Sequence, residues 1–300
     1  MRVLLLGKDG QLGWELLRAL GPLGEVIALG RADLDLSYPQ DIRRAVRAAR
    51  PTVIVNAAAY TAVERAEAEE AAAFAVNAEA PGVLASEAAA SGASLVHYST
   101  DYVFDGAKSG PYIEQDAVNP LGAYGRSKRG GELAIEASGC AHLILRTSWV
   151  YAARGSNFLL TMLRLANSQP ELRVVDDQLG TPNWSRLIAE VTAILLAATR
   201  GSLRECSGTY HLASSGGTSW HGFAQEIVTL GAAMHLCPLV PVIPIPTSQY
   251  RSATRRPANS MLLASKLAER FGLRLPDWRE GVRLCMEDLI ACRSASLDGH

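Results

Sequence analysis

A tyrosine and a lysine four positions apart, Tyr124 and Lys128 in the stretch YGRSK, are of the right types and spacing to handle a proton. On a helix, residues i and i+4 share one face, so the phenol and the ammonium can point into the same cleft. We expect the ammonium to favour the phenolate and to bring the pKa of Tyr124 from about 10 towards working pH. Alone, this spacing is also typical of solvated helix faces.

The stretch HYSTDYVFDG, at 97–106, places hydroxyl and carboxyl groups at the end of a predicted strand. Ser99, Thr100, Asp101 and Tyr102 lie at its carboxyl end, where ligands bind in open α/β sheets. A carbonyl that accepts hydride builds negative charge on oxygen and needs a proton donor and a hydrogen-bonding partner. The sequence therefore predicts a carbonyl-reducing site in which Thr100 orients the oxygen, Tyr124 donates the proton and Lys128 also holds the nicotinamide ribose.

A glycine-rich turn, GKDGQLG at 7–13, lies between a predicted strand and a predicted helix. Gly7, Gly10 and Gly13 let a pyrophosphate approach backbone N–H groups at the helix N-terminus. The spacing is G-x-x-G-x-x-G and departs from the usual G-x-G-x-x-G, so an ordinary tight turn is the alternative.

The next predicted strand ends at Gly30 and Arg31, where NAD-preferring domains place an acidic residue on the ribose 2′-hydroxyl. Arginine can pair with a 2′-phosphate, so we predict that NADPH is preferred and that NADH is possible. The alternative is a solvated Arg31, with Asp33 or Asp35 reaching back to the ribose.

Three alanines follow the third predicted strand in NAAAYTAV, at 56–63. Such small side chains let a cofactor lie flat against the strand end, and Thr61 offers a hydroxyl at the rim of the cleft. Plain packing is the alternative explanation of the alanines.

The elements that position these residues follow from the hydrophobic pattern of the first two-thirds of the chain. Short apolar runs alternate with longer amphipathic stretches, which is typical of βαβ units in a parallel sheet. We predict a Rossmann-type doubly wound parallel sheet of the α/β class. Its strands are predicted at 2–7, 25–30, 52–58, 94–100 and 141–149, and its helices at 13–20, 38–50 and 68–92, with Pro81 near a break.

Beyond Tyr151 the pattern is less regular and predicts a smaller C-terminal substrate-binding lobe. Five prolines between 236 and 260 predict an extended surface loop. We assign 1–150 and about 172–213 to the dinucleotide-binding domain, and about 151–171 and 214–300 to the lobe. The elements predicted after Tyr151 are helices at 157–167 and 185–199 and strands at 173–177 and 208–213.

Composition narrows the classes of protein and partner. With 300 residues, 48% of them hydrophobic, the chain can bury a large core, and a net charge of −1 gives no reason to expect nucleic acid or a membrane as partner. The five cysteines lack C-x-x-C spacing, which argues against disulfides and structural zinc. No apolar run is long enough for a signal peptide or a membrane span. We expect a cytoplasmic enzyme.

Five stretches carry a family resemblance: GKDGQLGWEL, NAAAYTAV, STDYVFDG, PLGAYGRSK and RTSWVYA. Over nearly its whole length, including DQLGTP at 177–182 and SRLIAEVTA at 185–193, the chain resembles the extended short-chain dehydrogenase/reductases. The resemblance implies a nucleotide-sugar ketoreductase. Its substrate would be dTDP-4-dehydro-β-L-rhamnose, whose C4 keto group NADPH reduces to give dTDP-L-rhamnose, and the smaller lobe would bind this sugar nucleotide.

The resemblance also implies roles for individual residues. The catalytic triad is Thr100, Tyr124 and Lys128. The residues expected to bind the cofactor are Gly7, Gly10, Gln11, Leu12, Arg31, Asp35, Leu36, Ala57, Ala58, Ala59, Tyr60, Tyr124 and Lys128. The residues expected to bind the substrate are Thr61, Val63, Thr100, Asp101, Tyr102 and Trp149. Without the family, Trp149 is equally read as a buried aromatic.

Some dimers of this family are described as sharing a magnesium ion between glutamates of the two subunits. Glu15 and Asp288 fall at two such places, but Arg186 stands where a third carboxylate is expected. A fixed cation repels a metal ion, so we predict no magnesium at an interface, while a homodimer stays open.

Three histidines, His97, His211 and His221, are further acid–base candidates. We expect His97 and His211 to be buried core residues because they lie in apolar strands, and the Tyr–Lys pair needs no help from them.

Two other functions compete with the ketoreductase. An epimerase or dehydratase of the same superfamily keeps its cofactor bound, but dehydratases carry Asp-Glu after the catalytic hydroxyl residue, and here Asp101 and Tyr102 follow Thr100. A non-catalytic, cofactor-binding regulatory subunit can lose triad residues without unfolding, whereas this chain keeps all three.

Overall fold

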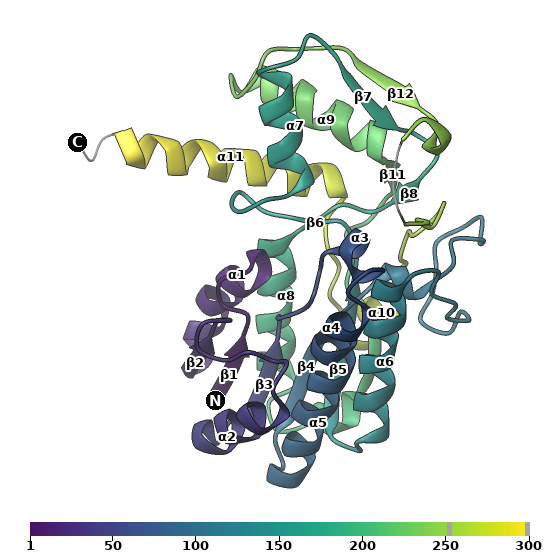
Figure 1. The fold of residues 1–300 in the computed structure, drawn as a ribbon. Coiled ribbons are helices and arrows are strands. Elements are labelled where there is room, and N and C mark those ends of the chain that lie inside the picture. Colours follow the sequence, from purple (N-terminus) through teal and green to yellow (C-terminus); the bar gives the residue numbers. More distant parts are fainter. Residues whose placement is uncertain (251–253, 298–300) are drawn as a thin grey trace.

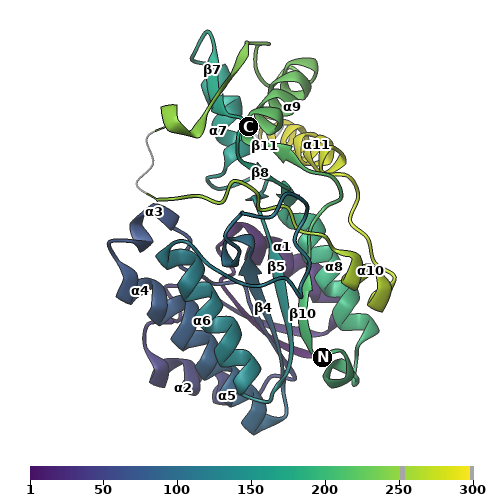
Figure 2. The ribbon, with the colours of Figure 1, turned by 90° about the vertical axis from the view of Figure 1, so that its right-hand side faces the viewer.

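The structure, a computed structural model, describes residues 1–250 and 254–297. Its larger part is built on six parallel strands in the order β2-β1-β3-β4-β5-β10 (Figures 1 and 2). The predicted Rossmann-type doubly wound sheet is confirmed. The order reverses between β1 and β3, the kind of point where open α/β sheets bind ligands. The strands are β1 (Arg2–Leu6), β2 (Glu25–Leu29), β3 (Val53–Asn56), β4 (Ser94–Thr100), β5 (Ala141–Thr147) and β10 (Gly208–His211).

Helices cover both faces of this sheet (Figure 2). Side chains alternate along each strand, so that Val3 and Leu5 join one core cluster while Leu4 and Leu6 join the other. Because neither face meets water, the strands read as continuous apolar runs. The first cluster includes α1 (Gln11–Leu20) and α8 (Ser185–Ala198), and the second includes α2 (Pro39–Ala49), α5 (Ala80–Ser91) and α6 (Ala123–Ala137).

The smaller lobe lies above the carboxyl ends of the strands in Figure 1. Its core joins α7 (Phe158–Ala166), α9 (Trp220–Ala233) and α11 (Trp278–Leu297) to the strand β7 (Leu172–Val175). In this lobe β7 pairs with β12 (Val242–Ile245).

Two segments differ from the predicted domain boundaries. We expected residues 172–175 in the dinucleotide-binding domain, but they form β7 of the smaller lobe, because a short apolar strand does not show in sequence which strand it pairs with. The helix α10 (Ser265–Phe271), which we expected in the lobe, packs its Leu267 into a core cluster of the large sheet.

Local structure differs from the prediction in two further places. The predicted helix at 68–92 is α4 (Glu70–Phe74), a π-helical turn (Ala75–Glu79) and α5, with Pro81 in the first turn of α5. The proline-rich stretch at 236–260 contains the strand β12 as well as loop. Besides four 3-10 turns, at Gly21–Leu23, Asp101–Val103, Leu203–Cys206 and Thr247–Gln249, the remaining short elements of the described residues are α3 (Val63–Ala66), β6 (Val150–Tyr151), β8 (Leu179–Gly180), β9 (Asn183–Trp184) and β11 (Thr218–Ser219).

Within residues 1–250 and 254–297, no helix is long and apolar enough to cross a membrane.

A buried ion pair fixes helix α6 against the sheet. Glu132 accepts hydrogen bonds at 2.8 Å from both Nε and Nη2 of Arg146 on β5, and Arg129 donates a further one at 2.8 Å. The side chains of Glu132 and Arg146 are 0% and 3% exposed. At the start of α6, the N–H of Ala123 donates to Glu67 Oε1 at 2.8 Å. The helix that carries Tyr124 and Lys128 is therefore held at its first turn and again near its middle.

Replacing Glu132 by glutamine should strongly destabilise the fold. The variant leaves the Arg146 guanidinium buried without a countercharge, and breaking a buried pair in this way costs about 3–5 kcal/mol. Glu136→Gln is the matched control, because Glu136 pairs with Arg129 at the surface, and exposed pairs contribute about 0–1 kcal/mol. Urea unfolding of both variants measures the difference. Equal, small losses would show that the ion pair does not fix the helix.

Candidate active site

The glycine-rich turn lies at the point where the strand order reverses. Gly7 has φ +85°, and a side chain there would run into the backbone of Ala57 and Ala58, which follow β3. A side chain at Gly13 would overlap the carbonyl of Gly7. The glycines therefore allow close packing at the N-terminus of α1, which begins at Gln11. This arrangement suits a pyrophosphate that meets free backbone N–H groups.

Two of the predicted cofactor residues, Gln11 and Leu12, begin helix α1. The side-chain oxygen of Gln11 accepts a hydrogen bond at 2.9 Å from Asn157, which also caps the N-terminus of α7. The turn at the end of β1 is thus bonded directly to the smaller lobe.

At the end of β2 the carboxylate of Asp33 is bonded within the protein, to the backbone and to the glycine-rich turn. Asp33 Oδ2 accepts from Gly30 N at 2.9 Å and from Lys8 Nζ at 2.6 Å. Arg31 is exposed beside this pair. Sequence reasoning missed Lys8, although its place in the glycine-rich turn is a signal for a cation near phosphate. The Asp35 carboxylate accepts from Ser37 N, and Leu36 is buried in the core.

The loop after β3, which holds Ala57 to Thr61, is anchored by a buried asparagine that sequence reasoning missed. Asn77 accepts from Tyr60 N at 2.8 Å and donates to Tyr60 O at 3.0 Å and to Ser127 Oγ at 3.1 Å. Ser127 lies on α6, so one side chain links this loop to the helix that carries Tyr124. Ala57, Ala58, Ala59 and Tyr60 are partly buried, Thr61 is exposed and Val63 begins α3.

The structure brings Thr100 and Tyr124 together. Thr100 ends β4, where its hydroxyl donates to Asp101 Oδ1 at 2.9 Å and accepts from Tyr102 N at 3.1 Å. Burial raises the pKa of Tyr124 to about 12, against the opposing hydrogen bond with Thr100. The expected lowering of this pKa is therefore wrong for this structure, because the burial of the phenol outweighs the influences that favour its ionised form. A phenol with so high a pKa stays protonated and able to donate at neutral pH.

The amino group of Lys128 is bound to strand β4. Lys128 is 2% exposed, and its Nζ donates to the carbonyl oxygen of Tyr98 at 2.6 Å and lies 3.1 Å from His97 Nε2. Burial lowers the pKa of Lys128 to about 8, against the opposing charge of Glu132. His97 and His211 are buried as predicted, at 1% and 0% exposed. The contact between His97 and Lys128 was not foreseen.

Asp101 lies beside the triad and is 2% exposed. Burial raises the pKa of this carboxyl group to about 6, despite hydrogen bonds from Ser260 and Thr100. Tyr102, the next residue, meets the Tyr124 ring edge-on with centroids 5.7 Å apart. Of these two predicted substrate residues, Tyr102 therefore borders the phenol directly, and Asp101 is linked to it through Thr100.

Trp149 occupies a strained turn just beyond β5. Its φ is +43°, which is uncommon for a residue other than glycine. The indole stacks on Trp220 of α9, with ring centroids 3.5 Å apart and an interplanar angle of 7°. It also covers Gly180, where any side chain would overlap it. Strain of this kind is often retained at ligand sites.

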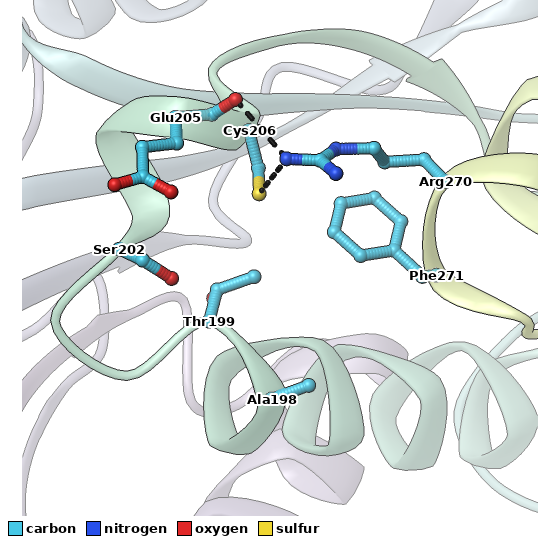
Figure 3. A pocket seen from close by; sticks show the side chains of 7 residues that line it. All are labelled: Ala198, Thr199, Ser202, Glu205, Cys206, Arg270 and Phe271. Atoms are coloured by element: carbon cyan, nitrogen blue, oxygen red, sulfur yellow. Dashed lines mark hydrogen bonds between the residues drawn. The ribbon is translucent and has the colours of Figure 1, made fainter.

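A surface hollow of about 380 Å³ lies away from these residues. It is formed by the end of α8, the 3-10 turn Leu203–Cys206 that precedes β10, and α10, and Arg270 Nη2 lies in it 3.1 Å from Cys206 Sγ (Figure 3). None of the predicted site residues lines it. Its lining residues are Ala198, Thr199, Ser202, Glu205, Cys206, Arg270 and Phe271.

The two carboxylates weighed as magnesium ligands are joined by the arginine between them. Arg186 donates to both carboxylate oxygens of Asp288, at 3.1 and 2.7 Å, and to Glu15 at 3.2 Å. Among the residues that the structure describes, no cluster of three or more histidine, cysteine or acidic side chains is arranged to hold a metal ion.

Comparisons with known proteins agree on one family. The family described as the RmlD substrate binding domain matches residues 1–291. A dTDP-4-dehydrorhamnose reductase of Burkholderia thailandensis is 52% identical over 97% of this chain and 100% of its own length. The enzyme of the same name from Escherichia coli strain K12 is 44% identical over 96% and 98%.

Solved structures give the same result. A dTDP-4-dehydrorhamnose reductase of Clostridium acetobutylicum superposes with a TM-score of 0.90 at 35% identity, covering 96% of this chain and 99% of that one. One from Bacillus anthracis, solved in complex with NADP, has a TM-score of 0.88 at 32% identity, with the same coverage. The chain therefore belongs to the RmlD family of NAD(P)H-dependent oxidoreductases, within the extended short-chain dehydrogenase/reductases.

The buried Asp101 should make the stability of the fold depend on pH. Its pKa is raised in the folded state, so its ionisation destabilises the fold as pH rises from about 4 to above 6. Asp101→Asn removes this penalty, so the stability of the variant relative to the parent should grow by about 2–3 kcal/mol between pH 4 and pH 8. Chemical unfolding at both pH values measures the change.

Asp105→Asn serves as the control with the opposite sign. Hydrogen bonds from Ala107 N, Asn119 and Tyr112 hold the pKa of Asp105 below its ordinary value. Its ionisation therefore stabilises the fold, and its loss should cost stability above about pH 4. If the stabilities of both variants changed with pH in the same direction relative to the parent, the raised pKa of Asp101 would be contradicted.

Proposed function

We propose that this member of the RmlD family reduces the C4 keto group of dTDP-4-dehydro-β-L-rhamnose with NADPH, giving dTDP-L-rhamnose. The observation that carries the proposal is that Thr100 at the end of β4 meets Tyr124 of α6, while Lys128 of α6 is bonded to the same strand, at the edge of the sheet where the glycine turn follows β1. The substrate comes from the names of the relatives, which are dTDP-4-dehydrorhamnose reductases over nearly the whole chain.

The geometry suits a reduction in which the cofactor, when bound, supplies a hydride to the carbonyl carbon. The hydroxyl of Thr100 orients the carbonyl oxygen, and Tyr124 donates the proton that the oxygen takes up. Burial keeps the phenol protonated until it is needed, since its pKa is about 12. Lys128, whose pKa of about 8 lies near working pH, returns a proton to the tyrosine and bonds the nicotinamide ribose.

The remaining site residues fall into two groups around this centre. For the cofactor we propose the turn from Gly7 to Leu12, the strand end with Arg31, Asp35 and Leu36, and the loop from Ala57 to Tyr60. For the sugar nucleotide we propose Thr61, Val63, Asp101, Tyr102 and Trp149, closed over by the smaller lobe.

No interface magnesium is proposed, because Arg186 already pairs with both Glu15 and Asp288 and places a fixed positive charge between them. A homodimer is compatible with this, since the ion pairs lie within one chain.

Tyr124→Phe should abolish the reaction while leaving the fold intact. Loss of a positioned proton donor lowers kcat by about 10²–10⁴-fold. The assay supplies freshly generated dTDP-4-dehydro-L-rhamnose and NADPH, follows NADPH consumption and identifies the product. Tyr210→Phe is the control, because Tyr210 is also buried but lies on β10, where its hydroxyl donates to Cys206 O, away from the proposed triad.

Three outcomes would count against the proposed function. A fully active Tyr124→Phe variant would show that Tyr124 is not the proton donor. Turnover of the sugar without net NADPH consumption would indicate an epimerase. Cofactor binding without any turnover by the parent protein would favour the regulatory role.

Arg31→Ala should lower the preference for NADPH. Asp33 is held by Lys8 and Gly30 N, which leaves Arg31 as the exposed cation at the end of β2. Losing one charge-assisted hydrogen bond to the 2′-phosphate should reduce the NADPH:NADH ratio of kcat/KM about tenfold. Arg44→Ala, an exposed arginine of α2, should leave the ratio unchanged. A parent ratio below one would show that Asp33 holds the ribose instead.

A further inference from the structure

A chain of three buried polar side chains runs beneath the candidate active site. Asn56 Nδ2 lies 3.1 Å from His97 Nδ1, and His97 Nε2 lies 3.1 Å from Lys128 Nζ. The three residues are 1%, 1% and 2% exposed. They come from the end of β3, from β4 and from α6, so the chain crosses from the strand before the cofactor loop to the catalytic helix.

The direction of the hydrogen bonds follows from the backbone. Ala58 N donates to Asn56 Oδ1 at 3.2 Å, which turns the amide nitrogen of Asn56 towards His97. His97 Nδ1 then accepts, so the hydrogen of the neutral imidazole is on Nε2 and faces Lys128. An ammonium cannot accept this hydrogen, but an amine can, while still donating to Tyr98 O.

The charged form of Lys128 needs the other arrangement. His97 must then accept at Nε2 and carry its hydrogen on Nδ1, and Asn56 must turn its oxygen towards the ring. That rotation takes the acceptor away from Ala58 N, in the loop proposed to contact the cofactor. His97 can serve both forms of the lysine because neutral imidazole has one donor and one acceptor.

We propose that His97 is a positioning residue for the reduction, which holds the amino group of Lys128 in place in both its protonated and its unprotonated forms. This inference rests on the proposed function, in which Lys128 returns a proton to Tyr124. The inference gives His97 a role in the reaction, whereas the apolar strand around it predicts only a buried core residue.

Other groups around the lysine do not replace this contact. Glu132, one turn along α6, is bonded to Arg146 of β5 and to Arg129. Asp101, which follows β4, and the Tyr124 phenol of α6 are both hydrogen-bonded to Thr100. Burial and the charge of Lys128 hold the pKa of His97 well below its ordinary value, so His97 contributes a hydrogen bond and no second charge.

Removing the contact between His97 and Lys128 should destabilise the ammonium form of the lysine more than its amine form. His97→Leu leaves Nζ with only the Tyr98 carbonyl, and a hydrogen bond to a charged group is stronger than one to a neutral group. The Lys128 titration and the alkaline limb of kcat/KM should therefore both move down by about one pH unit. We expect kcat to fall about tenfold, with the KM for NADPH within twofold of the parent value.

The lysine titration can be followed directly by NMR. The sequence has four lysines, Lys8, Lys108, Lys128 and Lys266, so protein labelled with 13C-lysine gives few Cε signals, and Lys128→Met identifies the one of interest. His97→Gln keeps a donor and an acceptor at similar reach and should restore the midpoint and most of kcat. His211→Leu is the control, since His211 is equally buried but lies on β10.

The outcomes separate the inference from the proposed function. An unmoved Lys128 midpoint and pH profile in folded His97→Leu would overturn the inference. If His97→Leu does not fold, His97→Asn, which is polar but too short to reach Nζ, replaces it, and the same result would overturn the inference. A shifted midpoint in a protein whose parent form does not reduce the sugar would support the contact and reject the proposed function.

Discussion

The burial of the Lys128 amino group is the constraint on which the rest of the site depends. An amino group removed from water is costly unless it meets hydrogen-bonding partners, and here these are the Tyr98 carbonyl, which accepts from it, and the His97 ring, both on β4. Helix α6 must pack against strand β4 in one particular register for the Lys128 amino group to reach these partners. The Glu132–Arg146 pair, one turn along α6, requires the same register between α6 and β5. Tyr124, one turn in the other direction, is thereby brought to Thr100.

Several groups at this edge of the sheet are held in protonation states that burial favours. The pKa values of Tyr124 and Asp101 are raised, and those of Lys128 and His97 are lowered. Each shift shows that the fold disfavours the ionised form of the group, and packing elsewhere in the protein must offset the free-energy cost of burying it. Such clustering is typical of sites that move protons, because acids and bases work best with pKa values matched to their task. Function and stability therefore oppose each other at this edge.

The smaller lobe is built from several separate segments of the chain. Its strand β7 and its helices α7, α9 and α11 are drawn from places far apart in the chain, and α10 returns to the sheet. The Gln11–Asn157 hydrogen bond joins this lobe to the glycine turn, and the stack of Trp149 on Trp220 joins it to the end of β5. Under the proposed function, a sugar nucleotide bound between the two parts would touch both, which would couple its position to that of the cofactor.

The sequence by itself determined the elements of the sheet, the glycine turn and the residues of the proposed triad, because strand periodicity, glycine spacing and an i, i+4 pair are local properties of the chain. Only the tertiary structure decided that β7 pairs with β12, that Asp33 turns back to Lys8, and that Arg186 joins Glu15 to Asp288. It also decided that His97 meets Lys128 and that Tyr124 is buried, and this burial overturned the expected lowering of the Tyr124 pKa. These contacts join residues distant in sequence, and their energies depend on burial and mutual orientation, which no local pattern encodes.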